Sequence, residues 1–239
     1  LFFEIARILE YQRPDAFLLE NVKNLNSHDK GKTIQIIKES MLASGYSFLS
    51  NIMNTKDYGN VPQTRERIYI IGFRGESAFN NEGGSDNAIC SNKFKYPEKI
   101  PLTKKVTDLY EEEVDFNKYY YGNKFMGDNG KSFKVLQDEI TRRDTVYQWR
   151  RVFVRENKSN LCPTLTANMG TGGHNVPLIR DNIGIRKLTP RECSRFQGFP
   201  ENFKLPQEVS NGQLYKQIGN SVSVPVIKRI AQRIRESLN

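Results

Sequence analysis

A run of apolar residues at 16–19 ends directly on Glu20, and this junction limits how the chain can fold. The run has the length and composition of a buried strand. An ionised carboxylate is costly to bury alone, so Glu20 must be solvated, paired with a cation or used in chemistry. Ligands of open α/β sheets bind at the carboxyl ends of strands. The junction therefore predicts either a functional carboxylate at a sheet edge or an ordinary solvated loop acid.

The segments around this strand predict an α/β sheet. Residues 1–12 and 33–43 have the apolar spacing of amphipathic helices, and Gly45 is placed to cap the second one. Two further segments, 46–53 and 68–73, have the composition of strands. The order helix, strand, helix, strand, strand is typical of α/β proteins.

The middle of the chain has a different composition. Residues 77–92 are rich in Asn, Ser and Gly, which indicates a loop or linker. Residues 118–158 contain ten Lys or Arg against five Asp or Glu, interleaved with eight aromatic residues. Residues 164–167, "TLTA", are a short strand candidate. The basic, aromatic stretch is the part of the chain best suited to a polyanion.

The last quarter contains clear helix signals. A capping box with Pro at the first helical position comes from Thr189, Pro190 and Glu192, and Gly198 with Pro200 marks the end of that helix. A final helix is expected to bury one stripe, made of Ile227, Ile230, Ile234 and Leu238.

One more turn is predicted before that final helix. Gly219 is expected to cap the preceding helix, which places Asn220 and Ser221 just ahead of the next one. Polar side chains and backbone N–H groups at such a position can hold a polar ligand, and the alternative is a plain junction between helices.

The charge of the whole chain favours an anionic partner. The 239 residues carry a net charge of +9 with a pI near 9.4, which is typical of nucleic-acid binding, although a basic protein without such a partner is the alternative. No apolar stretch approaches the roughly 20 residues that span a bilayer, so no membrane partner is expected. The three cysteines are widely spaced, which favours neither disulfides nor a metal site and fits a reducing cytoplasm.

Two arginines precede the strand at 68–73. In "DYGNVPQTRERIYIIGF", Arg65 and Arg67 alternate, so an extended chain places both on one side. Two guanidinium groups on one side suit the clamping of phosphate or carboxylate. The alternative is an exposed strand start with ordinary ion pairs.

Four segments, in this order, resemble the signature blocks of DNA (cytosine-5) methyltransferases of bacterial restriction–modification systems. They are "ENVKN", "DYGNVPQTRER", "RKLTPRECSRFQGFP" and "YKQIGNSV". The segment "TLTANMGTGGHNVP" is similar to the target-recognition region of that family. The resemblance implies part of a Rossmann-like sheet of S-adenosylmethionine-dependent methyltransferases plus a smaller target-recognition domain. It also implies transfer of a methyl group to C5 of a flipped-out cytosine in a specific duplex DNA sequence.

The resemblance assigns roles to individual residues. Glu20 would contact N3 and the exocyclic amine of the cytosine, and Arg65 and Arg67 would hold the flipped nucleotide. The S-adenosylmethionine pocket would be lined in part by Asn220 and Ser221. Target recognition would be anchored by Thr164 and Leu165, and DNA affinity would come from the basic stretch, through Arg142, Arg143, Arg150 and Arg151.

The chain departs from the family in one respect. It contains neither the glycine-rich cofactor loop nor the Pro-Cys dipeptide of the nucleophile, since Cys90, Cys162 and Cys193 follow Ile, Leu and Glu. The chain alone is therefore expected to be inactive and to need an N-terminal portion, in cis or as a second chain.

The expected organisation follows from the same resemblance. Residues 1–74 would form the second part of a catalytic domain, residues 75–214 the target-recognition domain, and residues 215–239 a helix that returns to the catalytic domain. A bacterial cytoplasmic location is expected. Two alternatives remain open, a DNA-binding module without catalysis and an RNA-directed relative on the same scaffold.

Overall fold

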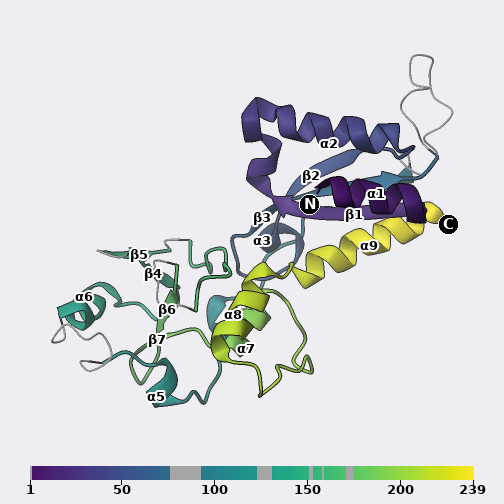
Figure 1. Ribbon diagram of the computed structural model, residues 1–239. Coiled ribbons are helices and arrows are strands. Elements are labelled where there is room, and N and C mark those ends of the chain that lie inside the picture. Colours follow the sequence, from purple (N-terminus) through teal and green to yellow (C-terminus); the bar gives the residue numbers. More distant parts are fainter. Residues whose placement is uncertain (1, 76–92, 123–130, 151–152, 158, 171–174) are drawn as a thin grey trace. The chain divides into compact units, whose positions relative to one another are not determined.

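The computed structural model describes residues 2–75, 93–122, 131–150, 153–157, 159–170 and 175–239, which form two compact units (Figure 1). Unit 1 contains Leu1–Asn54, Glu66–Lys99 and Val226–Asn239, and unit 2 contains Thr55–Arg65 and Ile100–Pro225. These units differ from the expected domains, because residues 55–65 and 215–225 belong to unit 2 and residues 93–99 to unit 1. The predicted linker at 77–92 lies outside the described residues.

Unit 1 is built on a three-stranded sheet. Its strands are β1 (Ala16–Val22), β2 (Leu49–Asn54) and β3 (Glu66–Phe73), in the order β1-β3-β2, with β3 antiparallel to both neighbours. The outer strands β1 and β2 therefore run in the same direction. They are joined through two short turns, η1 (Lys23–Asn26) and η2 (His28–Gly31), and the helix α2 (Lys32–Ala43). Parallel strands need a crossover connection of this kind, and the predicted helices and strands of this region are confirmed.

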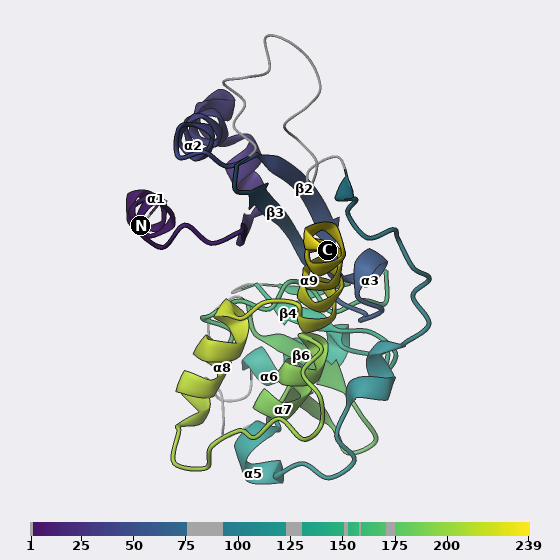
Figure 2. The same cartoon turned by 90° about the vertical axis from the view of Figure 1, so that its right-hand side faces the viewer.

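Two helices cover one face of this sheet. Figure 2 shows α1 (Phe2–Gln12) and α2 on the same side of the strands. The core on that side contains Ala6, Leu9, Phe17, Ile37, Met41, Tyr46, Ile68 and Ile70. Because side chains alternate along a strand, Glu20 and Tyr69 lie on the opposite face. The carboxylate is thus kept out of the helix-covered core.

The final helix differs in detail from its prediction. Helix α9 spans Val224–Leu238, and its buried residues include Val226 and Ile230. Leu238, expected on the buried stripe, is 44% exposed. The buried stripe therefore differs from the predicted one, because Val226 is buried where the apolar pattern predicted Ile227.

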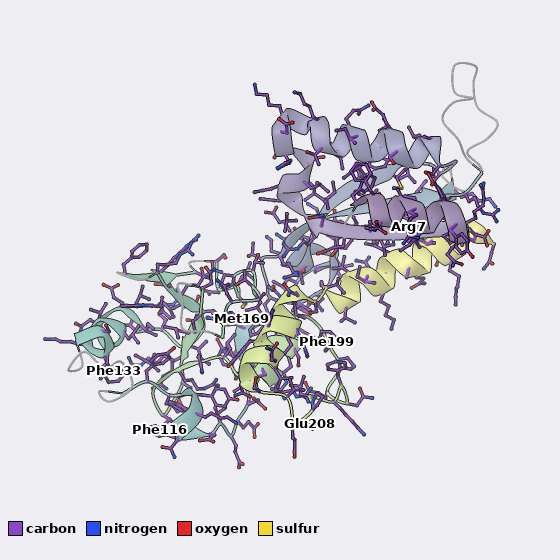
Figure 3. All side chains as sticks on the ribbon, viewed as in Figure 1. Arg7, Phe116, Phe133, Met169, Phe199 and Glu208 are labelled. Atoms are coloured by element: carbon purple, nitrogen blue, oxygen red, sulfur yellow. The ribbon has the colours of Figure 1, made fainter. Side chains whose placement is uncertain are left out.

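Unit 2 contains an antiparallel sheet. Its order is β5 (Val154–Glu156), β4 (Tyr147–Trp149), β6 (Pro177–Arg180) and β7 (Ile185–Lys187). Helix α6 (Lys131–Glu139) packs against it, and Phe133, labelled in Figure 3, lies beside a core of Leu136, Ile140, Tyr147, Val176, Leu178 and Ile185. Shorter helices of this unit are α3 (Thr55–Tyr58), η4 (Val106–Leu109) and α5 (Phe116–Tyr119).

A second core of unit 2 surrounds helices α7 (Pro190–Phe196) and α8 (Asn211–Asn220). The predicted capping box of α7 is confirmed, with the Thr189 hydroxyl accepting from the Glu192 N–H at 3.1 Å. Gly198 ends the helix with a φ of +80°, a conformation that glycine adopts without strain. The sequence therefore located both ends of α7.

The Glu192 carboxylate also takes part in a buried ion pair. The Arg186 guanidinium donates to both of its oxygens, at 2.8 and 2.7 Å, and its Nε donates to Asp181 at 2.7 Å. The side chains of Arg186 and Glu192 are 1% and 0% exposed. Removing one partner of such a pair would leave an uncompensated buried charge, so the pair fixes α7 against β7.

The prediction that Gly219 caps a helix is wrong. Gly219 lies inside α8 and is buried, and a Cβ at this position would lie 2.3 Å from the carbonyl carbon of Thr166. Glycine is required here because the helix passes directly against the backbone of another segment.

This close approach gives a test by substitution. We expect Gly219→Ala to destabilise the protein by about 1–3 kcal/mol, because a backbone carbonyl cannot move aside as a side chain does. Gly212→Ala, in the same helix, meets no atom within 4 Å and is expected to be neutral or stabilising by up to about 1 kcal/mol. Urea denaturation of both variants measures the difference. Equal effects would show that the contact with Thr166 is relieved without cost.

Candidate functional site

Glu20 is paired with an arginine of the neighbouring strand. Strand register places Val22 opposite Arg67, so Glu20 and Arg67 are diagonal neighbours on one face of the sheet. The Arg67 Nε lies 3.0 Å from Oε1 of Glu20, and the two side chains are 14% and 24% exposed. Glu20 lies within β1, so the reading of it as a solvated loop acid is wrong.

The pair buries one oxygen of the Glu20 carboxylate against Arg67. Oε1 of Glu20 is buried and has no hydrogen-bond partner among the described residues, because the Arg67 Nε is close but not aligned as a donor. Buried carboxylate oxygens are normally hydrogen-bonded. Because this oxygen is buried against Arg67, an external donor can reach only the exposed 24% of the Glu20 side chain.

Arg65 makes a different set of contacts from Arg67. Its side chain is 3% exposed, and it donates to the carbonyl oxygens of Leu165 at 3.0 Å and Ser221 at 2.5 Å. The sequence predicts that both arginines hold the same anion. In the structure, Arg65 instead joins backbone segments of unit 2. These partners are 100 and 156 residues away in sequence, which is why local alternation could not identify them.

Two buried glutamines extend this arrangement. Gln63 and Gln197 are both 0% exposed, and the Gln63 amide nitrogen donates to the Gln197 Oε1 at 3.2 Å and to the carbonyl of Phe196. Gln197 in turn donates to the carbonyl of Ile218 at 2.8 Å. We call Gln63, Arg65 and Gln197 the polar hub. Sequence reasoning quoted the segments of both glutamines and assigned neither a role.

The polar hub also fixes the "TLTA" segment. This segment is irregular and not the predicted strand, because side chains take the place of a strand partner for its backbone. The Leu165 N–H donates to Oε1 of Gln63 at 3.2 Å, and the Thr164 hydroxyl donates to the carbonyl of Thr64 at 2.6 Å. The Leu165 side chain is 2% exposed, in the same core as Met169 (Figure 3). Leu165 thus anchors the segment from inside the protein.

The two residues expected to line a cofactor pocket lie at the end of α8. Asn220 is the last residue of α8, and Ser221 is its C-cap. Helix α9 begins three residues after Ser221, so the two residues do not directly precede it as predicted. The Ser221 hydroxyl donates to the carbonyl of Ile218 at 2.7 Å. Asn220 is exposed. The carboxamide of Asn220 is therefore the group of this pair that can reach a ligand.

The basic stretch contains arginines in different states of pairing. Arg142 lies 2.7 Å from a carboxylate oxygen of Asp144 and 3.0 Å from one of Glu156, which neutralises it within the chain. Arg143 and Arg150 instead donate to neutral amides, those of Asn182 at 2.6 Å and Asn175 at 3.0 Å. Arg151 lies outside the described residues. Arg143 and Arg150 retain charge that an anion can use.

A pocket of about 440 Å³ opens beside this stretch. Its lining includes Thr164 and Thr166 together with Gln148, Arg150 and Arg155. Of its ten described lining residues, nine are polar and none is acidic. Sequence reasoning found Thr164 and Arg150 but missed Gln148 and Arg155, which carried no distinguishing signal.

The described cysteines are packing residues. Cys162 and Cys193 are 0% exposed, and burial raises the pKa of both thiols well above the ordinary value. A thiol that stays protonated is a poor nucleophile. Cys90 lies outside the described residues. Among the residues that the structure describes, His, Cys, Asp and Glu form no group of three or more suited to a metal ion.

Comparison with known proteins identifies relatives along the whole chain. A Type II methyltransferase of Bacillus sp. (strain RFL6), M.Bsp6I, is 49% identical over 240 residues, which cover 100% of this chain and 70% of the relative. The Shigella sonnei enzyme M.SsoII is 41% identical over 239 residues, and the chain spans 58% of its length.

No helix in the described part of this chain has the length and apolar character needed to cross a bilayer.

The fold has counterparts among solved structures. The S. pombe Dnmt2 methyltransferase matches with a TM-score of 0.67 at 19% identity, over 100% of this chain and 73% of that one. The α/β, Rossmann-like fold of a methyltransferase is thus confirmed. The family model described as C-5 cytosine-specific DNA methylase matches residues 1–236, nearly all of the sequence. The chain therefore belongs to the C-5 cytosine-specific DNA methylase family.

Proposed function

We propose that this chain provides the base-recognition and target-recognition parts of an enzyme that methylates cytosine at C5 in a specific duplex DNA sequence, within a restriction–modification system. The observation that carries the proposal is the Glu20–Arg67 pair on β1 and β3, which holds in place a carboxylate whose side chain is 24% exposed. A flipped cytosine offers an N–H donor to such a carboxylate.

Glu20 would act directly on the base. Attack on C6 by a cysteine nucleophile from outside the described residues would build negative charge on the ring through N3. A proton donated by the Glu20 carboxyl to N3 would neutralise that charge, while the other carboxyl oxygen would accept from the exocyclic amine and so discriminate against thymine. Arg67, 3.0 Å from the carboxylate, would act as a positioning residue that fixes the orientation of Glu20.

The polar hub would support recognition by fixing the backbone of the Thr164 segment. Arg65 and Gln63 hold both backbone groups of Leu165, so Thr164 and its neighbours are presented at the pocket in one conformation. A base contact depends on such support, because an ångström of displacement breaks a bidentate hydrogen bond. Arg65 would therefore serve recognition as a positioning residue, without touching the nucleotide.

The methyl group would come from S-adenosylmethionine. In this chain the exposed carboxamide of Asn220 fits a polar part of that molecule, because it offers both a donor and an acceptor. The carbonyl of Ser221 is already an acceptor for Arg65, so Ser221 would shape the turn around the site.

A second candidate function is a DNA-binding subunit that catalyses nothing by itself. The observation that favours it is the burial of Cys162 and Cys193, whose thiols have raised pKa values. The two candidates are compatible if a separate N-terminal portion supplies the nucleophile. Double-stranded DNA is the partner in both.

The first prediction concerns Glu20. In an enzyme completed with an N-terminal portion, we expect Glu20→Gln to slow single-turnover methyl transfer by about 10²–10³-fold, because the amide keeps the shape and cannot transfer a proton to N3. DNA affinity should change far less. The control is Glu66→Gln, which removes a carboxylate that pairs with Lys23 on the same sheet. A wild-type rate for Glu20→Gln would remove the residue from the mechanism.

The second prediction uses the pairing of two adjacent arginines. Removal of one phosphate contact lowers the slope of log affinity against log salt by about 0.9. We expect this change for Arg143→Ala, whose partner is a neutral amide, and a smaller one for Arg142→Ala, whose charge is already neutralised. Binding titrations of duplex DNA over a salt series measure both slopes. Equal slopes for the two variants would contradict the assignment.

The third prediction concerns the 239 residues alone. We expect no methyl transfer to cytosine-containing duplex DNA, and restoration of transfer when a family N-terminal portion with the Pro-Cys dipeptide is added in trans or in cis. The reason is that the described thiols are buried and protonated. The measurement is incorporation of labelled methyl groups. Robust turnover by the chain alone would direct attention to Cys90.

A further inference from the structure

Two side chains in the pocket of unit 2 face each other across neighbouring strands. Gln148 of β4 and Arg155 of β5 are directly opposite in register. On both strands the alternate residues Tyr147, Trp149 and Val154 face the core beside α6. Alternation therefore directs Gln148 and Arg155 to the other face, where both line the pocket of about 440 Å³.

Both side chains lack a partner among the described residues. Gln148 is only 7% exposed, and none of the described side chains or backbone groups hydrogen-bonds to its carboxamide. Its nitrogen and oxygen are not among the buried polar atoms, so the small exposed part of this residue is its carboxamide, which opens onto the pocket. Arg155 is exposed and forms no ion pair with the residues around it in the described structure, whereas the neighbouring Arg150 donates to Asn175. The pair is thus open to a ligand from outside.

The chemistry of the pocket limits the class of ligand that it can bind. None of the described residues that line it is acidic, which argues against a cation. A phosphate group offers acceptors only, which would leave the Gln148 carbonyl without a donor. A base pair in the major groove offers donors and acceptors side by side, and an arginine reads the O6 and N7 of guanine through two parallel hydrogen bonds.

We propose that Gln148 and Arg155 form a base-reading pair that determines the recognition sequence, in which Arg155 binds a guanine and Gln148 the adjoining base edge. This inference rests on the proposed function, because it takes duplex DNA as the ligand. The Thr164 segment, held by the polar hub, lines the same pocket.

The test is selection of bound duplexes from a random-sequence library by the complete methyltransferase. For the wild-type protein we expect a defined motif that contains guanine. Arg155→Ala is expected to relax one guanine position, with about a 5- to 150-fold loss of discrimination there. Arg155→Lys is expected to relax it too, because lysine keeps the charge and lacks the two-pronged donor. Gln148→Ala should relax the same or the adjoining position.

The control is Lys216→Ala, which removes an equal charge from an exposed position of α8 outside the pocket and should leave the motif unchanged. Uniformly weaker binding by Arg155→Ala, with an unchanged motif and full recovery in Arg155→Lys, would identify a phosphate contact and overturn the proposal. Thermal melting confirms that each variant is folded. Bisulfite sequencing of the same library tests cytosine methylation separately from base reading. A guanine preference without methylcytosine would count against the proposed function and not against base reading.

Discussion

The buried hydrogen bonds of Gln63, Arg65 and Gln197 are the interaction on which unit 2 depends. These side chains are 0%, 3% and 0% exposed, so each of their hydrogen bonds that is lost would cost about 1–3 kcal/mol of the roughly 5–15 kcal/mol that stabilises a domain. They join the backbone at 165, 196, 218 and 221, four positions that belong to three separate segments of the sequence. Irregular backbone can be buried here because these side chains satisfy it.

The polar hub has a consequence for recognition. It holds a loop in one conformation from the inside, through Leu165, and leaves Thr164 at the surface of a polar pocket. Gly219 contributes by allowing α8 to approach the backbone of Thr166 within the distance that a side chain would block. A loop supported in this way can present side chains for binding without the entropy cost of ordering them at each encounter.

In unit 1 the polar group that must be held in place is a carboxylate, and an ion pair holds it. The sheet buries one face under α1 and α2 and places Glu20 on the other, where Arg67 compensates its charge. The pair is partly exposed, so its contribution to stability is small. Its arrangement suits a carboxylate that is held in place and still partly exposed. The distinction between Arg67 and Arg65, two residues apart, is that one pairs with a carboxylate and the other with carbonyl groups.

The sequence by itself determined the local structure and the family. Apolar spacing located α1, α2, β1 and β3, and the capping box and Gly198 located α7, because these signals act within a few residues. Four motifs in order were enough to identify the methylase family. Only the tertiary structure decided that Gly219 is a contact and not a cap, that 164–167 is a loop, and that Gln148 and Arg155 share a pocket. The physical reason is that each of these depends on a partner distant in sequence, and periodicity carries no information about which distant backbone a side chain will meet.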